Sequence, residues 1–584
     1  MIQAIGLTSN PRKELPPALD DVSFEAHAGC VTALLGASGA GKTTALRLML
    51  QLQQGRGITH FRGRPLHRIA HPSREVGVLL GDVPGHPART VRGQLRMLCA
   101  AAGVPVRRAD EVLEVVGLVS LRDERLGTLS RGMDRRLGLA CALLADPHTL
   151  VLDEPAAGLA AREGRWLHGI LRAHAVQGGT VLFTTEDPKE AAGTADRVVT
   201  LAEGKLLADQ PAADFARTRL RPRVAVRSPH AARLGALLAK EARTAQRSVE
   251  VVHEDGNRLS VYGSACADVG EAAFRHGILV HQLADEIGDM GPRAAESPDG
   301  HQNDGPRPVE VLSADAPSAL PPPISVRPAP GPLRPLRYEL RRTAGVGTGY
   351  LTAAAVLVTS ALISLLLARI GHTPQARLLT AWPREFPLPP AAFGAGLLGA
   401  LAFGEEFRHP ALAADRGTVP RRLGLLVAKL LVSGVTGLVL ALLTAVCDQE
   451  VLYLVYGREV SGVPSDWLRP AVSWVGFVVG CAWAGVLAAG IFRSTTAGLA
   501  AVLTVPILVV PLVQKLVQGP SVRTTAGFSV RLREHLLSQW PFGGERVLAA
   551  AARAVAQPVG GALTLSLAAL LCAYLLTTLR GRVR

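Results

Sequence analysis

The chain of 584 residues is too long for one ordinary hydrophobic core, so we expect several domains. Apolar residues make up 48% of it and aromatic residues only 4%, a balance that favours membrane helices of small aliphatic residues over a wholly soluble protein. The net charge of +15 suits a nucleic-acid partner, but the arginines form no long basic run and many flank apolar segments, so we expect none. The seven cysteines are scattered and predict neither a disulfide framework nor a zinc site.

Residues 1–220 have the pattern of a layered α/β domain. Short apolar runs at 31–35, 149–153 and 180–185 predict buried parallel strands, and helical patterns separate them. The first residues contain no continuous apolar core of a signal peptide. We therefore expect this domain to stay in the cytosol.

A glycine-rich segment follows the first of these strands. It matches the pattern G-x-x-x-x-G-K-[ST] and precedes a helical stretch, which is the context that a phosphate-binding loop requires. Glycines let backbone N–H groups wrap around phosphate oxygens, and the helix adds its positive N-terminal end. We expect Lys42 to reach the β- and γ-phosphates of ATP and Thr43 to offer a hydroxyl to Mg²⁺. The predicted ATP-binding residues are Gly36, Ala37, Ser38, Gly39, Ala40, Gly41, Lys42, Thr43 and Thr44.

Two adjacent acids end the strand at 149–153. Asp153 fits the role of holding Mg²⁺, and Glu154 would face the γ-phosphate and polarise a water for attack. Such a pair after a strand is often only a solvated strand end. Together with the phosphate loop, however, it predicts an ATPase with Thr43 and Asp153 as metal ligands and Glu154 as the catalytic residue.

The segment Leu-Ser-Arg-Gly-Met at 129–133 precedes another helical stretch. The phosphate loop, this segment and the run LVLDEP at 150–155, in that order, resemble the ATP-binding cassette of ABC transporters over roughly residues 1–210. The resemblance implies that ATP and Mg²⁺ are cofactors and that two cassettes pack head to tail, as a homodimer or with a related half-transporter. The signature that would close over the ATP of the partner chain consists of Ser130, Arg131, Gly132 and Met133.

Three positions depart from the pattern of that family. Gly81 stands where a glutamine is usual, Ala160 where the D-loop has its aspartate, and Glu186 where a histidine follows the strand at 180–185. An ionised glutamate cannot donate a hydrogen bond to the γ-phosphate and repels it. We therefore expect firm ATP binding with slow or partner-dependent hydrolysis. No aromatic residue before the phosphate loop is clearly placed to stack on adenine.

Residues 221–284 predict a small α+β domain. Its expected strands lie at 223–228, 248–253, 258–263 and 277–283, and its helices at 229–246 and 266–275. The order β-α-β-β-α-β favours a ferredoxin-like fold.

Residues 285–336 are rich in Pro, Asp, Gly and Ser, and they predict a flexible linker. A PxxP ligand for an aromatic groove is the less favoured alternative.

Residues 337–584 predict an all-α transmembrane domain. A membrane span needs about 20 apolar residues, and six stretches qualify: 346–368, 387–404, 424–447, 470–491, 495–516 and 559–579. Arginines flank these stretches on one side, which predicts cytosolic termini and an external loop at 517–558. The bundle resembles an ABC-2-type permease, with 404–431 similar to its cytosolic turn, and the fused order resembles a G-type half-transporter.

Taken together, these resemblances imply export of a substrate from the cytosol or inner leaflet across the cytoplasmic membrane. The segment 405–422 and the arginine-rich stretch before the first span are expected to contact the ATPase domain. The alternative is a membrane-anchored ATP-binding regulator or partner subunit with weak or no ATPase activity, and the altered switch positions favour it modestly. The hydrophobic half excludes a soluble nucleic-acid ATPase. Lipid, peptide, antibiotic and polysaccharide substrates all remain open.

Overall fold

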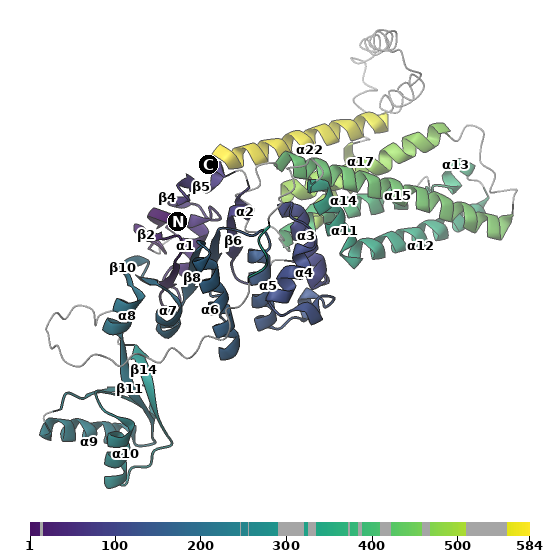
Figure 1. The fold of residues 1–584 in the computed structure, drawn as a ribbon. Coiled ribbons are helices and arrows are strands. Elements are labelled where there is room, and N and C mark those ends of the chain that lie inside the picture. Colours follow the sequence, from purple (N-terminus) through teal and green to yellow (C-terminus); the bar gives the residue numbers. More distant parts are fainter. Residues whose placement is uncertain are drawn as a thin grey trace.

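The computed structural model has an α/β half, a small appended domain and a helix bundle (Figure 1). It describes residues 1–11, 16–69, 71–83, 85–245, 247–254, 256–289, 320–324, 334–371, 374–383, 388–408, 422–457, 468–509 and 558–583.

A six-stranded sheet forms the centre of the N-terminal domain. Its strands are β3 (Val31–Leu35), β6 (Val76–Leu79), β7 (Thr149–Leu152), β8 (Thr180–Thr185), β9 (Arg197–Ala202) and β10 (Lys205–Pro211). They lie in the order β10-β9-β3-β8-β7-β6, and all pairs are parallel except that of the edge strand β10. The predicted strands form β3, β7 and β8, whose residues are buried because both faces of the sheet are covered.

An antiparallel sheet and a helix cover one face of this central sheet. The antiparallel sheet contains β1 (Ile2–Ser9), β2 (Val22–Ala26), β4 (Gly55–Phe61) and β5 (Arg64–Pro65). Its apolar side chains join those of α1 (Lys42–Met49) and of the central strands in one hydrophobic core, to which Ile2, Phe24 and Leu182 belong.

Helices cover the other face of the central sheet. They are α3 (Val91–Ala102), α4 (Arg108–Val115), α5 (Arg131–Leu143), α6 (Ala161–Val176), α7 (Pro188–Thr194) and α8 (Ala212–Arg219), and a short α2 (Pro72–Glu75) precedes β6. Three 3₁₀ turns lie at Leu66–Arg68, Val119–Leu121 and Leu126–Thr128. Leu95, Leu137 and Ile170 from these helices pack against the central strands in a second core.

The small domain has the element order β-α-β-β-α-β. Its elements are β11 (Leu220–Arg227), α9 (Ala231–Thr244), β12 (Glu250–His253), β13 (Arg258–Tyr262), α10 (Cys266–Arg275) and β14 (Gln282–Asp289). The strands form an antiparallel sheet in the order β12-β13-β11-β14. Val224, Leu234 and Val261 lie in its core.

The expected fourth strand at 277–283 and the domain limit at 284 are wrong. Gly277 has a φ of 63° just after α10, and Ile278 is buried in the core of the small domain. This apolar run is therefore a loop whose side chain at Ile278 packs into the core, not a strand. The strand that pairs with β11 is β14, which runs to Asp289.

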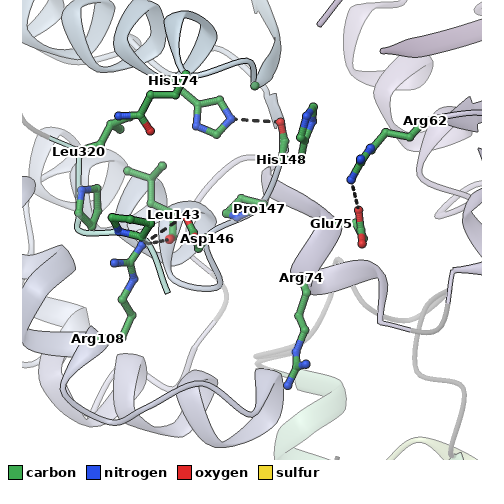
Figure 2. Close-up of a pocket in the computed structure, with 14 residues that line it drawn as sticks. Arg62, Arg74, Glu75, Arg108, Leu143, Asp146, Pro147, His148, His174 and Leu320 are labelled. Atoms are coloured by element: carbon green, nitrogen blue, oxygen red, sulfur yellow. Dashed lines mark hydrogen bonds and ion pairs between the residues drawn. The ribbon is translucent and has the colours of Figure 1, made fainter. Parts of the chain in front are cut away.

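One segment of the predicted linker packs against the ATPase half. Leu320 and Ile324 contact its hydrophobic core, and the Ile324 N–H donates to Asp146 Oδ2 at 3.1 Å. The buried guanidinium of Arg108 donates to the carbonyl of Pro322. Leu320 lines a cavity of about 270 Å³, and the side chains of His148 and His174 line it as well (Figure 2). The expectation of a linker without core contacts therefore fails at 320–324, where two apolar side chains flank the PPP run.

The C-terminal half is a bundle of helices that run side by side (Figure 1). Its helices are α12 (Gly347–Ile370), α13 (Gln375–Leu378), α14 (Pro390–Arg408), α15 (Arg422–Tyr456), α17 (Leu468–Phe492), α18 (Thr495–Thr504) and α22 (Pro558–Val583), and a π-helical turn at Val505–Val509 follows α18. Helix α14 is rich in glycine and alanine, which lets it pack closely against α17: a Cβ on Gly399 would stand 2.1 Å from the carbonyl of Ala482.

In the described part of the chain, three helices are long and apolar enough to cross a membrane: Gly347–Ile370, Leu423–Tyr456 and Trp474–Phe492. Thr495–Val509 and Thr564–Leu576 are shorter apolar helices, and α14 ends in charged residues. The count of six spans stays a prediction; 510–516 of the fifth and the loop 517–557 lie outside the described residues. The expected limit of the third span is wrong, because α15 continues past residue 447 to Tyr456.

Candidate functional site

The predicted phosphate loop connects β3 to α1. Gly41 has a φ of 99°, and a Cβ there would stand 2.5 Å from the carbonyl of Ala18, so only glycine fits. Gly39 also has a positive φ, of 82°. The two turns bring the chain sharply from the strand into the N-terminus of α1, where free N–H groups and the helix dipole favour an anion.

The ammonium of Lys42 lies at the centre of this loop, and the side chain is only 4% exposed. Its Nζ donates to the carbonyls of Gly36 and Ala37, at 2.9 and 3.1 Å. It also donates to Glu186 Oε1 at 2.9 Å and lies 3.6 Å from Glu154 Oε1. The structure thus pairs the lysine expected to bind phosphate with a carboxylate at the altered switch position.

A chain of short hydrogen bonds links the loop to the acids that follow β7. Thr43 Oγ1 donates to Asp153 Oδ2 at 2.8 Å, and Thr184 Oγ1 donates to Asp153 Oδ1 at 2.7 Å. The Glu154 N–H in turn donates to Thr184 Oγ1 at 2.8 Å, and Glu154 has a φ of 45°. This bond anchors the backbone of Glu154, whose side chain is 39% exposed and turned toward Lys42.

The hydroxyl of Thr43 and the carboxylate of Asp153 fit a magnesium ion. Mg²⁺ prefers oxygen ligands and is commonly held by one or two protein groups together with phosphates and waters. Among the described residues, no group of three or more His, Cys, Asp or Glu side chains is arranged to hold a metal by itself. The donor set therefore matches an ion that arrives with a nucleotide.

Comparisons with known proteins identify the family of this part of the chain. Residues 19–157 match the family described as ABC transporter. These residues form an ABC transporter ATP-binding domain. Residues 222–290 match a domain of unknown function (DUF8746).

Two relatives show the range of this likeness. The Nod factor export ATP-binding protein I of Burkholderia thailandensis is 36% identical over 203 residues, which are 33% of this chain and 65% of that protein. The sulfate/thiosulfate import ATP-binding protein CysA of Nocardia farcinica is 34% identical over 217 residues, 34% of this chain and 64% of that protein. This chain thus spans slightly less than two thirds of these relatives. A solved ATP-binding subunit of an ABC transporter is 24% identical, with a TM-score of 0.34, and the likeness covers 37% of this chain and 92% of that one.

The predicted signature begins helix α5 of the ABC domain. Ser130 is its N-cap and accepts a hydrogen bond from the Met133 N–H at 3.3 Å, while Arg131 starts the helix. Gly132 lies against the turn at Gly158, whose carbonyl would be 3.2 Å from an added Cβ. Within the described residues, no hydrogen bond or ion pair joins the signature to the phosphate loop of the same chain.

Helix α5 also fixes the altered Q-loop position. Arg135 donates to the carbonyl of Gly81 at 2.7 Å, and Asp134 accepts from the Val83 N–H at 3.0 Å. Gly81 has a φ of 69°, a conformation that strains any residue with a side chain. Burial raises the pKa of Asp134, and the hydrogen bond from Val83 opposes this shift.

The altered D-loop position, Ala160, is the N-cap of α6. Its N–H donates to Glu163 Oε2 at 3.1 Å, and Glu163 also forms an ion pair with Arg136 of α5 at 2.5 Å. Arg136 stacks over Trp166 at 5.2 Å. Ala160 therefore has a backbone role here, and its methyl group cannot form a hydrogen bond to a nucleotide.

Sequence reasoning missed Thr184, which holds both Asp153 and Glu154. The parallel pairing of β7 with β8 sets Leu152 beside Phe183, so the residue after each lies at the same edge of the sheet. The pairing of the two strands would have identified it, because Thr184 follows the last apolar residue of TVLFTT. The cavity of Figure 2 contains none of the predicted nucleotide-binding residues, and its arginines already bind carbonyls and carboxylates.

A buried ionic cluster joins the ABC domain to the C-terminal helix bundle through α11 (Arg334–Ala344). Glu339 of α11 forms ion pairs with Arg342 at 2.8 Å and with Lys429 of α15 at 2.6 Å. Lys429 also pairs with Glu406 of α14 at 2.5 Å and lies 4.7 Å from the ring centre of Phe403. Glu339 and Lys429 have at most 1% of their side chains exposed.

The electrostatics of this junction favour its charged form. Burial alone would raise the pKa of Glu339, but the cations Arg342 and Lys429 outweigh it and leave that pKa below its ordinary value. Burial raises the pKa of Tyr338 well above its ordinary value, and the neighbouring carboxylate of Glu406 raises it further.

The ABC domain contacts the junction through α3 and the turn before it. The guanidinium of Arg89 donates to the carbonyls of Arg341 and Arg342, at 3.3 and 2.9 Å, and Arg341 donates to the carbonyl of Arg96 at 2.6 Å. The predicted contact of the arginine-rich stretch with the ATPase domain is therefore present. Of the other predicted contact segment, 405–422, residues 409–421 lie outside the described residues, and Glu406 reaches the junction.

Proposed function

We propose that this chain is an ABC half-transporter that couples ATP binding and hydrolysis to export of a substrate across the cytoplasmic membrane. One observation carries the proposal. The buried cluster of Glu339, Lys429 and Glu406 connects α11, α14 and α15, and backbone hydrogen bonds connect α11 to the ABC domain. Such a rigid joint passes a movement of the ABC domain to the membrane helices.

The nucleotide site supplies the motor. Lys42 and the loop N–H groups would bind the phosphates of ATP, and Thr43 and Asp153 would hold Mg²⁺, which neutralises charge on the β- and γ-phosphates when bound. Glu154 would orient the attacking water as a general base. Thr184 positions both acids through the bonds already described.

The other half of each nucleotide site would come from a second cassette. Ser130, Arg131, Gly132 and Met133 lie at the N-terminus of α5 and have no bond to their own phosphate loop among the described residues, as expected for groups that act on a partner chain. We propose a homodimer or a pair with a related half. We further propose six spans of the ABC-2 type, cytosolic termini and a ferredoxin-like fold for the small domain.

Export is favoured over import by the fusion of cassette and permease that this chain resembles. The relatives include the ATP-binding proteins of an exporter and an importer, so the cassette alone does not set the direction. The substrate class stays open, and transport itself is the deciding test.

The test uses the purified full chain in proteoliposomes with its cassettes facing outward. Uptake of labelled phospholipid, peptide, antibiotic and polysaccharide probes is followed after ATP is added. We expect ATP-dependent accumulation of one class. Lys42→Ala should lower ATP affinity by about 100-fold, since it removes about 2.7 kcal/mol of charge-assisted binding, and should abolish transport. Lys189→Ala, an exposed lysine of α7, is the matched control and should leave both unchanged.

A second candidate function is an ATP-binding regulator with weak or no hydrolysis. The pairing of Lys42 with Glu186 at 2.9 Å favours it, because an arriving γ-phosphate must compete with a carboxylate for the same ammonium. If all four probes stay outside while ATP binds with Lys42-dependent affinity, the regulator replaces the transporter.

A further inference from the structure

A polar stripe lies between the membrane helices α12 and α15. Ser360 and Ser364 on α12, and Thr444 and Asp448 on α15, have at most 1% of their surface exposed. Each pair is four residues apart and so lies on one helix face, and the two helices pack against each other. Both helices are otherwise strongly apolar, so a carboxyl group at their contact needs an explanation.

The carboxyl group of Asp448 has a hydrogen-bond donor at one of its two oxygens. Ser360 Oγ donates to Asp448 Oδ2 at 2.7 Å. Oδ1 is buried, and among the described residues it has no hydrogen-bond partner and no Lys, Arg or His forms an ion pair with Asp448. An ionised carboxylate in such a place costs several kcal/mol, whereas a neutral acid costs far less.

Other charged groups on the neighbouring elements lie away from Asp448. Arg369 of α12 is nine residues beyond Ser360, roughly 13 Å along the helix. Arg377 of α13 is exposed, and Glu405 and Glu406 of α14 belong to the junction end of the bundle. On α15 itself, Glu450 follows Asp448 by two residues and so lies on the other side of the helix. Leu367, Leu378 and Leu452 fill the space beside the stripe.

We propose that Asp448 is a proton-binding site of the membrane domain. Its carboxyl group holds a proton while α12 and α15 are packed together, and releases it to water as hydronium when the two helices separate. The proposal goes beyond the transport function and does not depend on which substrate is carried. A metal cation fits less well, because it requires several oxygen ligands and the hydroxyls of Ser364 and Thr444 are already donated to the carbonyls of Leu378 and Ala441, at 3.0 and 2.9 Å.

Infrared spectroscopy of the full chain in lipid nanodiscs at neutral pH tests the bound proton. The spectrum of Asp448→Asn is subtracted from that of the unchanged chain. We expect the difference to contain the C=O band of a protonated carboxylic acid, shifted in D₂O. Glu450→Gln is the matched control on the same helix and should leave that band in place. Loss of only a carboxylate band on Asp448→Asn would overturn the proposal.

Two further samples test exchange and guard against a misfolded variant. Ser360→Ala keeps the acid and removes its hydrogen bond, so the same band should move to higher frequency; an unmoved band would show that it belongs to another acid. Glu154→Gln, loaded with ATP and Mg²⁺, should hold the closed cassettes and reduce the band as the helices part. A band of undiminished size in that sample would refute proton release, whatever the transport assay shows.

Discussion

Two buried lysines, one in each half of the molecule, are each held by two glutamates. Lys42 lies among Glu186 and Glu154 at 2.9 and 3.6 Å, and Lys429 among Glu339 and Glu406 at 2.6 and 2.5 Å. The difference is in the acids. Glu186 and Glu154 are 47% and 39% exposed, whereas Glu339 and Glu406 are 1% and 17% exposed.

Exposure decides what each lysine can do. Around Lys42, water can solvate the acids when another anion arrives, so the ion pairs can be exchanged for phosphate at little cost. Around Lys429, each charge is desolvated, and loss of one partner leaves the others uncompensated. The first lysine therefore suits a binding site and the second a permanent joint.

The largest expected effect is that of breaking the joint. Lys429→Met should destabilise the protein by about 3–5 kcal/mol, because Glu406 loses its cation and the buried Glu339 keeps only Arg342. Thermal unfolding in detergent measures the loss, and ATP binding measured on the folded fraction should be retained. Lys240→Met, an exposed lysine of α9, is the matched control.

The double variant Lys429→Met with Glu406→Gln sharpens this prediction. Removing both charges leaves the ion pair of Glu339 with Arg342 and should restore part of the lost stability, since a neutral group is cheaper to bury than a single charge. A double variant no more stable than Lys429→Met alone would mean that the ion pairs of Lys429 contribute little to the joint.

A smaller effect is expected from changing an ion-pair partner of Lys42. Glu186→His removes the carboxylate that occupies Lys42 and restores a donor for the γ-phosphate, so we expect ATP hydrolysis to rise about tenfold, or about 1.4 kcal/mol of barrier. Phosphate release at saturating ATP measures it. Asp187→Asn, which caps α7 beside Glu186, changes an acid without touching Lys42 and serves as the control. Unchanged hydrolysis in Glu186→His would locate the limit elsewhere, at Gly81 or Ala160.

The same contrast explains what the sequence could predict. The ABC fold and the strands at 31–35 and 180–185 were predictable, because the phosphate loop is contiguous and strong apolar runs flank it. The pairing of Lys42 with Glu186 was not, since 144 residues separate the two. The joint was harder still, because Glu339, Glu406 and Lys429 come from three segments. A lone lysine in the apolar run AKLL at 428–431 was the one local signal of it.

The predicted bounds of two elements were wrong, because contacts between distant segments do not appear in a local sequence pattern. The apolar run at 277–283 alternates like a strand, but Ile278 is buried in the core of the small domain. The more polar β14 is the strand that pairs with β11 in the sheet. The polar residues at 448–450 interrupt the apolar pattern of α15, which resumes at 451–456, and within the helix Asp448 accepts a hydrogen bond from Ser360 of α12. In both cases tertiary packing overrides the local pattern.

The smallest expected effect is the pH dependence of stability, which differs between the junction at Glu339 and the ABC domain at His174. The lowered pKa of Glu339 means that its contribution to stability is present above the unfolded value, near pH 4.5, and is lost as pH falls through the lower folded value. Burial lowers the pKa of His174, which is 9% exposed, so its neutral form is required in the folded ABC domain. Stability from His174 is therefore present above pH 6.5 and declines as pH falls below it.

Hydrogen exchange between pH 7 and pH 5 distinguishes these responses. After correction for the intrinsic rate, amides of α6 around His174 should lose protection on acidification, while amides of α11 around Glu339 should keep theirs. His174→Gln should flatten the response of α6 and leave α11 unchanged. Protection of α11 that rises as the pH falls would show that Glu339 is protonated in the folded chain. The joint would then be held by a neutral acid, and its contrast with the exchangeable acids of Lys42 would disappear.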